Sequence, residues 1–193
     1  MVRNQLGLKR DARAGGLAAQ LDMLSEGMRA AVLAACDAYA ALGVPYALVG
    51  GLAAGARGRP RFTKDVDFLV GEEAFTRSGL IVSFAKPMPL QAGDVAIDPI
   101  PLPEDPRRRE VLTRALASAE IDDTTGRRVP ILTGTWLAYM KLASPRGKDR
   151  DDIVGMIQTG TVDREALEAA IVGDAELEGR WKLALEELAL ADE

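Results

Sequence analysis

Histidine is absent from the 193-residue chain, and this absence excludes several kinds of site at once. Ser-His-Asp and Cys-His catalysis, histidine-ligated zinc and imidazole general bases all need the missing side chain. Any chemistry must therefore use carboxylates, lysine, arginine or a metal ion held by oxygen ligands.

Cysteine is nearly absent as well, because Cys36 is the only one in the sequence and cannot form a disulfide within the chain. Its surroundings, AAVLAACDAYA, predict a helix in which Cys36 is a small buried hydrophobic side chain rather than a nucleophile. A reducing, cytoplasmic setting fits this composition.

No segment approaches the roughly 20 apolar residues that span a bilayer, and the first 20 residues lack the apolar core of a signal peptide. We expect a soluble protein with no membrane partner. An apolar fraction of 48% and a charged fraction of 27%, without Ser, Gln or Pro tracts, are typical of one compact globular unit.

The net charge of −5 is unevenly distributed. Residues 151–193 hold 12 acidic and 3 basic residues, which leaves residues 1–150 with a balance of +4. The basic residues gather at 57–64, 107–109, 127–128 and 141–150, and such clusters are compatible with a polyphosphate or nucleic-acid partner. They are equally compatible with solvated surface charge.

Hydrophobic periodicity predicts helices and strands that alternate in the first two thirds of the chain, followed by helices alone. The predicted strands are 44–51, 65–70, 80–85, 94–100 and 127–132, and Pro99 indicates a strand end or sheet edge. The predicted helices are 23–42, a short one from 52, 107–117, and four after Thr133, with Thr133, Asp149 and Asp163 as N-caps of the first three and Leu177, Trp181, Ala184 and Leu188 lining the last. This order predicts an α+β fold with a small mixed sheet flanked by helices. Residues 1–132 form its core, and residues 133–193 form a helical region packed on that core.

Asp65 and Asp67 are the first candidates for a site, in the stretch GRPRFTKDVDFLV. Alternate residues of a strand point to the same side, so both carboxylates project from one face. Burying them uncompensated would cost several kcal/mol, whereas a divalent cation takes oxygen ligands of this kind. The pair therefore suggests a metal site, although the acids could also simply face water.

Gly50 and Gly51 precede this pair, where a strand turns into a helix. Missing side chains there let backbone N–H groups approach a phosphate, and the helix dipole favours negative charge. A tight turn is the alternative reading of the two glycines. Thirteen residues between Gly51 and Asp65 allow glycines and carboxylates to meet at one end of the sheet.

The stretch VGGLAAGARGRPRFTKDVDFLV resembles the signature of the polymerase-β-like nucleotidyltransferase fold. Together with KLASPRGKDRDDI, it is similar to the AbiEii/MenT-like nucleotidyltransferases, many of which are toxins of toxin–antitoxin pairs. The resemblance covers about residues 30–155, and one departure is Gly51, where many members of the fold have serine.

The resemblance implies roles for individual residues. The metal-binding pair would be Asp65 and Asp67, with Asp98 as the third carboxylate and Asp94 as a weaker candidate for it. The residues matching the nucleotide-binding positions are Gly50, Gly51, Arg61, Thr63, Lys141, Arg146, Lys148 and Asp149, with Asp152 in the same stretch. The lysine at 141 would also act in catalysis by neutralising phosphate charge.

The implied reaction is transfer of a nucleoside monophosphate from a nucleoside triphosphate such as ATP, with Mg²⁺ or Mn²⁺. The acceptor stays open: a tRNA 3′ end or other RNA, a protein hydroxyl, or a small molecule such as an aminoglycoside. A toxin-like role implies a cognate antitoxin protein as partner. The alternatives are a protein-AMPylating or antibiotic-modifying transferase, and a catalytically idle scaffold that binds nucleotides or a partner.

Overall fold

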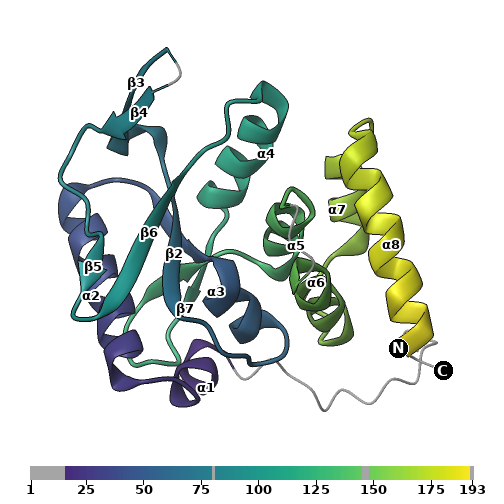
Figure 1. Cartoon of the computed structure of the whole chain (residues 1–193), viewed down its shortest axis with the longest axis horizontal. Helices are drawn as coiled ribbons and strands as arrows, with labels where there is room; N and C mark the ends of the chain where they lie inside the picture. Colours follow the sequence, from purple (N-terminus) through teal and green to yellow (C-terminus); the bar gives the residue numbers. More distant parts are fainter. Residues whose placement is uncertain (1–15, 80, 145–147, 192–193) are drawn as a thin grey trace, which may run out of the picture.

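The core of the fold is a six-stranded sheet with the strand order β5-β6-β2-β1-β8-β7 (Figure 1). The computed structural model describes residues 16–79, 81–144 and 148–191. The six strands are β1 (Tyr46–Val49), β2 (Asp65–Val70), β5 (Gln91–Ala92), β6 (Val95–Pro101), β7 (Glu120–Asp122) and β8 (Val129–Ile131).

The sheet mixes parallel and antiparallel pairs. Strand β1 is antiparallel to β2 and parallel to β8, whereas β2 is parallel to β6. The short outer strands β5 and β7 pair antiparallel with β6 and β8. The predicted α+β class with a small mixed sheet is thus confirmed.

Three helices precede or interrupt the central strands: α1 (Gly16–Asp22), α2 (Glu26–Leu42) and α3 (Gly50–Arg57). Helix α2 begins at the cap Ser25, whose side chain accepts a hydrogen bond from the N–H of Met28. Its apolar stripe is buried and includes Cys36 and Tyr39. The ring of Tyr39 packs against Phe68 of β2 at 5.1 Å between centroids, which fixes which face of β2 is turned to α2.

Strand β6 tolerates Pro99 near its end because of the way in which the strand is paired. Its outer neighbour β5 pairs only with Val95 and Ala96, so the later residues pair on one side alone, with β2. Pro99 lies opposite Phe68 in this one-sided part, where no partner requires the missing N–H. The prediction that Pro99 marks a sheet edge is confirmed.

Several predicted boundaries need correction. The predicted helix 23–42 begins at Glu26, and a separate helix, α1, precedes it. The predicted strand 80–85 exists as β4 (Ile81–Phe84), but β4 pairs with β3 (Phe75–Ser78) in a two-stranded sheet of its own, after the 3₁₀ turn η1 (Glu72–Ala74). Strands β3, β5 and β7 were not predicted, because they are too short to carry a detectable alternation.

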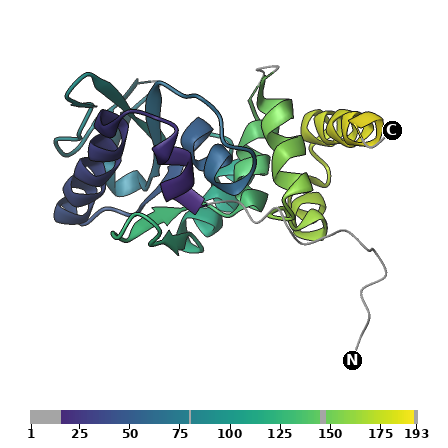
Figure 2. The same cartoon turned by 90° about the horizontal axis from the view of Figure 1, so that it is seen from below.

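The chain after the sheet is helical, as predicted, and lies to one side of it (Figures 1 and 2). These helices are α5 (Gly134–Leu142), α6 (Lys148–Gln158), α7 (Arg164–Ile171) and α8 (Ala175–Ala191). Asp163 caps α7 by accepting from the N–H of Ala166, whereas Thr133 occupies the cap position of α5 without a side-chain hydrogen bond. Helices α5 and α6 both contact α3, which joins this region to the core. The division at residue 132 stays a prediction.

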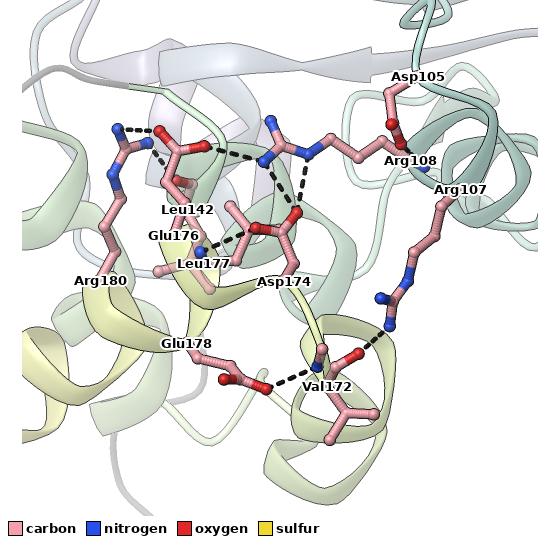
Figure 3. Close-up of polar contacts among 11 residues, drawn as sticks. Asp105, Arg107, Arg108, Leu142, Val172, Asp174, Glu176, Leu177, Glu178 and Arg180 are labelled. Atoms are coloured by element: carbon pink, nitrogen blue, oxygen red, sulfur yellow. Dashed lines mark hydrogen bonds and ion pairs between the residues drawn. The ribbon is translucent and has the colours of Figure 1, made fainter.

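Helix α4 (Pro106–Ala117) also bonds to the C-terminal helical region. Its Arg108 donates to Asp174 at 2.8 Å and to Glu176 at 2.9 Å, at the turn that leads from α7 into α8. Figure 3 shows this Arg108 clamp, together with Arg180, which bonds both Glu176 and the carbonyl oxygen of Leu142 in α5. Within the described part of the chain, no helix is long and apolar enough to cross a membrane.

Candidate metal and nucleotide site

Three aspartates converge where β2 and β6 lie side by side. Because Phe68 faces α2, strand alternation turns Asp65 and Asp67 to the opposite face of the sheet. Asp98 of β6 lies directly beside Asp67 in the parallel register. Each carboxylate offers one oxygen, and these three oxygens lie within 4.8 Å of one another.

Gly50 makes the room that Asp67 occupies. A β-carbon on Gly50 would lie 2.5 Å from Cγ of Asp67, and the φ of Gly50 is +67°, which side chains rarely adopt. The neighbouring backbone N–H of Gly51 donates to the Asp67 carboxylate. The predicted turn from strand to helix at these glycines therefore holds one of the three acids.

The electrostatic environment of the cluster disfavours the charged form of Asp67. Burial raises its pKa to about 6, and the charges of Asp65 and Asp98 add to this effect. Lys141 and the Gly51 N–H act in the opposite direction and only partly offset it. The folded chain thus gathers three acidic groups that repel one another, an arrangement that a bound cation would relieve.

The segment 58–64 joins α3 to β2, and its residues Arg61 and Thr63 both contact aspartates. Thr63 donates from Oγ1 to Oδ1 of Asp65 at 2.8 Å, which orients that carboxylate. Arg61 turns to Asp152 of α6, with its Nε 2.7 Å from Oδ1 and its Nη2 2.9 Å from Oδ2. Arg61 and Thr63 also lie close to Gly51, next to the position that a β-carbon on this glycine would occupy.

Lys141 of α5 lies between two buried acids of α6. Its Nζ is 2.6 Å from Oδ1 of Asp149 and 2.8 Å from Oδ2 of Asp152. Since Asp152 also holds Arg61, one buried carboxylate joins both cations. The prediction that Asp149 caps its helix is wrong, because α6 begins at Lys148 and Asp149 lies in its first turn. Asp149 and Asp152 both contact Lys141 instead.

These side chains line one pocket. Its walls are made of residues from α3, the segment 58–64, β2, β6, α5 and α6: Gly50, Gly51, Arg61, Thr63, Asp65, Asp67, Ile100, Leu137, Met140, Lys141, Ser144 and Asp149. Acidic groups and the cations Arg61 and Lys141 both line the pocket, so it suits a ligand that carries both phosphates and a cation.

Most of the residues predicted for a site meet here, and a few do not. Asp98 belongs to the cluster found among the described residues, whereas Asp94 lies in the turn before β6 and does not. Arg146 lies outside the described residues. Lys148 opens α6, and its role in nucleotide binding stays a prediction.

One polar residue of this region was not predicted. Gln20 of α1 is fully buried and bonds the backbone of Arg61 with both ends of its amide. No signal in the sequence pointed to it, because a lone glutamine in a short helix 41 residues away carries no motif.

The basic run 107–109 was compatible with a nucleic-acid partner or with solvated surface charge, but its three arginines are paired within the fold. Arg108 pairs with Asp174 and Glu176, Arg109 pairs with Glu72 at 2.9 Å, and Arg107 donates to the carbonyl oxygen of Val172. Acids distant in sequence and one carbonyl oxygen supply these partners. The run therefore fastens the fold and offers less free charge to RNA than its composition indicated.

Comparisons with known proteins add a likeness to solved structures. No protein-family model matches the sequence, and no curated protein does. The chain is similar to the crystal structure of an antigenic nucleotidyltransferase-like protein from Paracoccidioides brasiliensis, with a TM-score of 0.49 and 18% sequence identity over 84% of this chain and 93% of that chain. A likeness of this size carries no conclusion about function, so the function has to follow from the side chains of the site.

Proposed function

We propose that this chain is a metal-dependent nucleotidyltransferase that moves a nucleoside monophosphate from a nucleoside triphosphate to a hydroxyl acceptor. One observation carries the proposal: three carboxylate oxygens lie within 4.8 Å of one another, and two of these acids, Asp65 and Asp67, line one pocket together with Arg61 and Lys141. Metal ligands and phosphate-binding cations thus border the same space.

The donor set fits Mg²⁺ or Mn²⁺. All three candidate ligands are carboxylates, the oxygen donors that hard divalent cations prefer, and Thr63 and the Gly51 N–H already orient two of them. Asp65, Asp67 and Asp98 would hold a divalent ion, which would supply positive charge against the reacting phosphate.

The residues of the pocket would divide the remaining work. Gly50 and Gly51 would shape the pocket by making room for Asp67 and Arg61, while Arg61 and Lys141 offset the charge of the triphosphate. The acceptor oxygen would form a bond to the α-phosphorus as the bond to pyrophosphate breaks. Asp98, the most exposed of the three acids, would take the proton of the attacking hydroxyl.

The finer assignment follows the sequence resemblance to the AbiEii/MenT-like group. It favours a toxin component of a toxin–antitoxin pair, with an RNA such as a tRNA 3′ end as acceptor and a protein antitoxin as partner. A neighbouring gene for a small regulator would support this setting. Phe62, with 76% of its surface exposed next to the pocket-lining Arg61 and Thr63, is an aromatic surface on which an unpaired base could stack.

Transfer of a radioactive label tests the proposal directly. The purified protein is incubated with each α-labelled ribonucleoside triphosphate and Mg²⁺ or Mn²⁺, together with cellular RNA, protein and small molecules. These acceptor pools are then separated and counted. We expect label in one pool, and its identity names the acceptor class.

Matched variants make the assay specific. Asp65→Asn and Asp67→Asn should abolish transfer, whereas Asp94→Asn, which changes an exposed acid outside the cluster, should retain it. Equal transfer by the wild type and both cluster variants would refute the metal site. Metal-dependent nucleotide binding without label in any pool would favour the idle scaffold.

A further inference from the structure

We propose that Gln20 is the positioning residue that sets the segment 58–64 against the pocket, an inference that rests on the proposed function. Its side chain is fully buried. The amide Nε2 donates to the carbonyl oxygen of Arg61 at 2.6 Å, and Oε1 accepts from the N–H of Arg61 at 3.1 Å. One side chain thus pairs with both backbone groups of one residue, as a strand neighbour would.

These two bonds hold a segment with little other support. Outside the helices and strand ladders, and among the described residues, no peptide group of 59–63 bonds to another peptide group. Gln20 therefore supplies the backbone bonds at the middle of the segment, and a buried amide that lost them would leave polar groups unsatisfied.

Helix α3 is shaped to admit the glutamine. A β-carbon on Gly55 would lie 2.6 Å from Cδ of Gln20, so an alanine there would displace the amide. Glycine in a helix interior is unfavourable compared with alanine. Room for Gln20 offers a physical reason for glycine at this position.

Helix α1 is itself anchored at its start. The N–H of Leu17 donates to Oδ2 of Asp122 at 3.0 Å, and the N–H of Ala18 donates to Oγ1 of Thr124 at 2.9 Å. Asp122 ends the edge strand β7. These bonds fix the position of Gln20 relative to the main sheet. The bonds from Gln20 then fix the backbone of Arg61 relative to the same sheet.

The consequence for the site follows from the two side chains that the segment carries. Arg61 reaches Asp152 and lies beside Gly51, while Thr63 orients Asp65. A backbone shift at Arg61 would move a cation of the pocket away from the triphosphate. The carboxylates of Asp67 and Asp98 lie on strands and would stay in place.

The test compares nucleotide binding with metal binding in Gln20→Met and Gly55→Ala. Gln20→Met keeps the length of the side chain and removes both bonds, whereas Gly55→Ala leaves Gln20 intact and displaces it. Calorimetry with each of the four ribonucleoside triphosphates and Mn²⁺ should show affinity reduced about tenfold or more in both variants. Affinity for Mn²⁺ alone should change by less than about twofold, and hydrogen exchange of the Arg61 amide should accelerate in both.

A control variant separates positioning from general loosening. Val111→Ala removes buried volume from α4, which carries no residue of the pocket, and should leave nucleotide affinity unchanged. Wild-type affinity in Gln20→Met and Gly55→Ala would overturn the role of Gln20 while leaving the proposed function standing. An equal loss of affinity in Val111→Ala would overturn it too. Failure of the wild type to bind any of the four nucleotides would overturn the proposed function and this inference together.

Discussion

Gly50 and Asp67 are in such close contact that the first has no room for a side chain while the second remains where it is. The contact joins the start of α3 to the middle of β2, and the neighbouring N–H of Gly51 bonds the same carboxylate. The two glycines therefore shape the acidic cluster itself.

Gly50→Ala should abolish divalent metal binding. The new methyl group would overlap the Asp67 carboxylate and push it away from Asp65 and Asp98, and the positive φ adds a backbone penalty of about 1–2 kcal/mol. Calorimetric titration with Mn²⁺ measures the loss of binding, and urea unfolding measures the loss of stability.

Gly160→Ala is the matched control for this substitution. Its φ is +71°, close to that of Gly50, but a β-carbon there meets nothing within 4 Å. It should carry a similar backbone penalty and bind Mn²⁺ normally. Normal binding by Gly50→Ala as well would mean that Asp67 is not needed for the metal.

Asp67→Asn should stabilise the metal-free protein. The substitution keeps the shape of the side chain and removes a partly buried charge that Asp65 and Asp98 repel. In a chelator, the melting temperature should rise by roughly 2–4 °C, which corresponds to about 1 kcal/mol in a chain of this size. Asp94→Asn, outside the cluster, should leave it unchanged.

In excess Mn²⁺, the wild type should instead have a higher melting temperature than Asp67→Asn. A ligand that binds the folded state alone at about 100 times its dissociation constant contributes roughly 2.7 kcal/mol. The wild type should gain this stabilisation and Asp67→Asn should not. A variant that melts below the wild type in chelator and still responds to Mn²⁺ would contradict both the repulsion and the metal site.

The sequence made part of this site predictable because strand geometry is local. Two-residue alternation in DVDFLV indicated that Asp65 and Asp67 share a face, and the buried Phe68 agrees with that pattern. The glycine pair marked the turn into α3 for a similar local reason. Asp98 needed more than local pattern, since only the parallel register of β2 and β6 brings it beside Asp67.

The remaining contacts were hidden because they join charges that are distant in the chain. Arg61 meets Asp152 across 91 residues, and Arg108 meets Asp174 across 66. Neither pair leaves a periodic signal: Arg61 was predicted to bind nucleotide through the resemblance alone, and Arg108 was placed only in a basic cluster. Gln20 could not be predicted either, because its partner is a peptide group and every residue of a sequence contributes one.

Cys36 should not react with a thiol reagent in the folded protein. Burial disfavours the thiolate and raises the pKa of Cys36 to about 12. At pH 8, Ellman's reagent should therefore release no colour from the native chain and one equivalent after denaturation in guanidinium. Rapid reaction of the native chain would show that α2 opens away from the sheet.

Lys141→Met should destabilise the fold strongly. The lysine lies between Asp149 and Asp152, whose side chains are 4% and 6% exposed, so its loss removes a cation from two buried carboxylates. Removing one partner of a buried ion pair typically costs about 3–5 kcal/mol. Urea unfolding should show a loss of this order.

Lys182→Met provides the exposed counterpart. Lys182 is 79% exposed and 3.9 Å from Glu186, and surface pairs of this kind contribute roughly 0–1 kcal/mol. Its unfolding curve should match the wild type. A similar small effect of Lys141→Met would show that the acids of α6 reach water when the lysine is absent.

The Arg108 clamp should make stability depend on pH at the acidic end. Burial alone would raise the pKa of Asp174, but the hydrogen bond from Arg108 and that from the N–H of Leu177 outweigh burial, so the pKa is lowered. The hydrogen bond from Arg108 also lowers the pKa of Glu176. Groups with a lowered pKa in the folded state stabilise it above their unfolded pKa of about 4 and lose that contribution as the pH falls through the folded value.

Arg108→Gln should therefore lower the melting temperature by roughly 2–4 °C at pH 7 and by progressively less below pH 4. Arg114→Gln is the matched control on the same helix, because Arg114 is 69% exposed and lies 3.5 Å from Glu110. Melting curves of both variants and the wild type between pH 3 and 8 provide the comparison. A constant difference between Arg108→Gln and the wild type across that range would assign the loss to packing of the arginine stem, because packing does not titrate, and would exclude the clamp as its source.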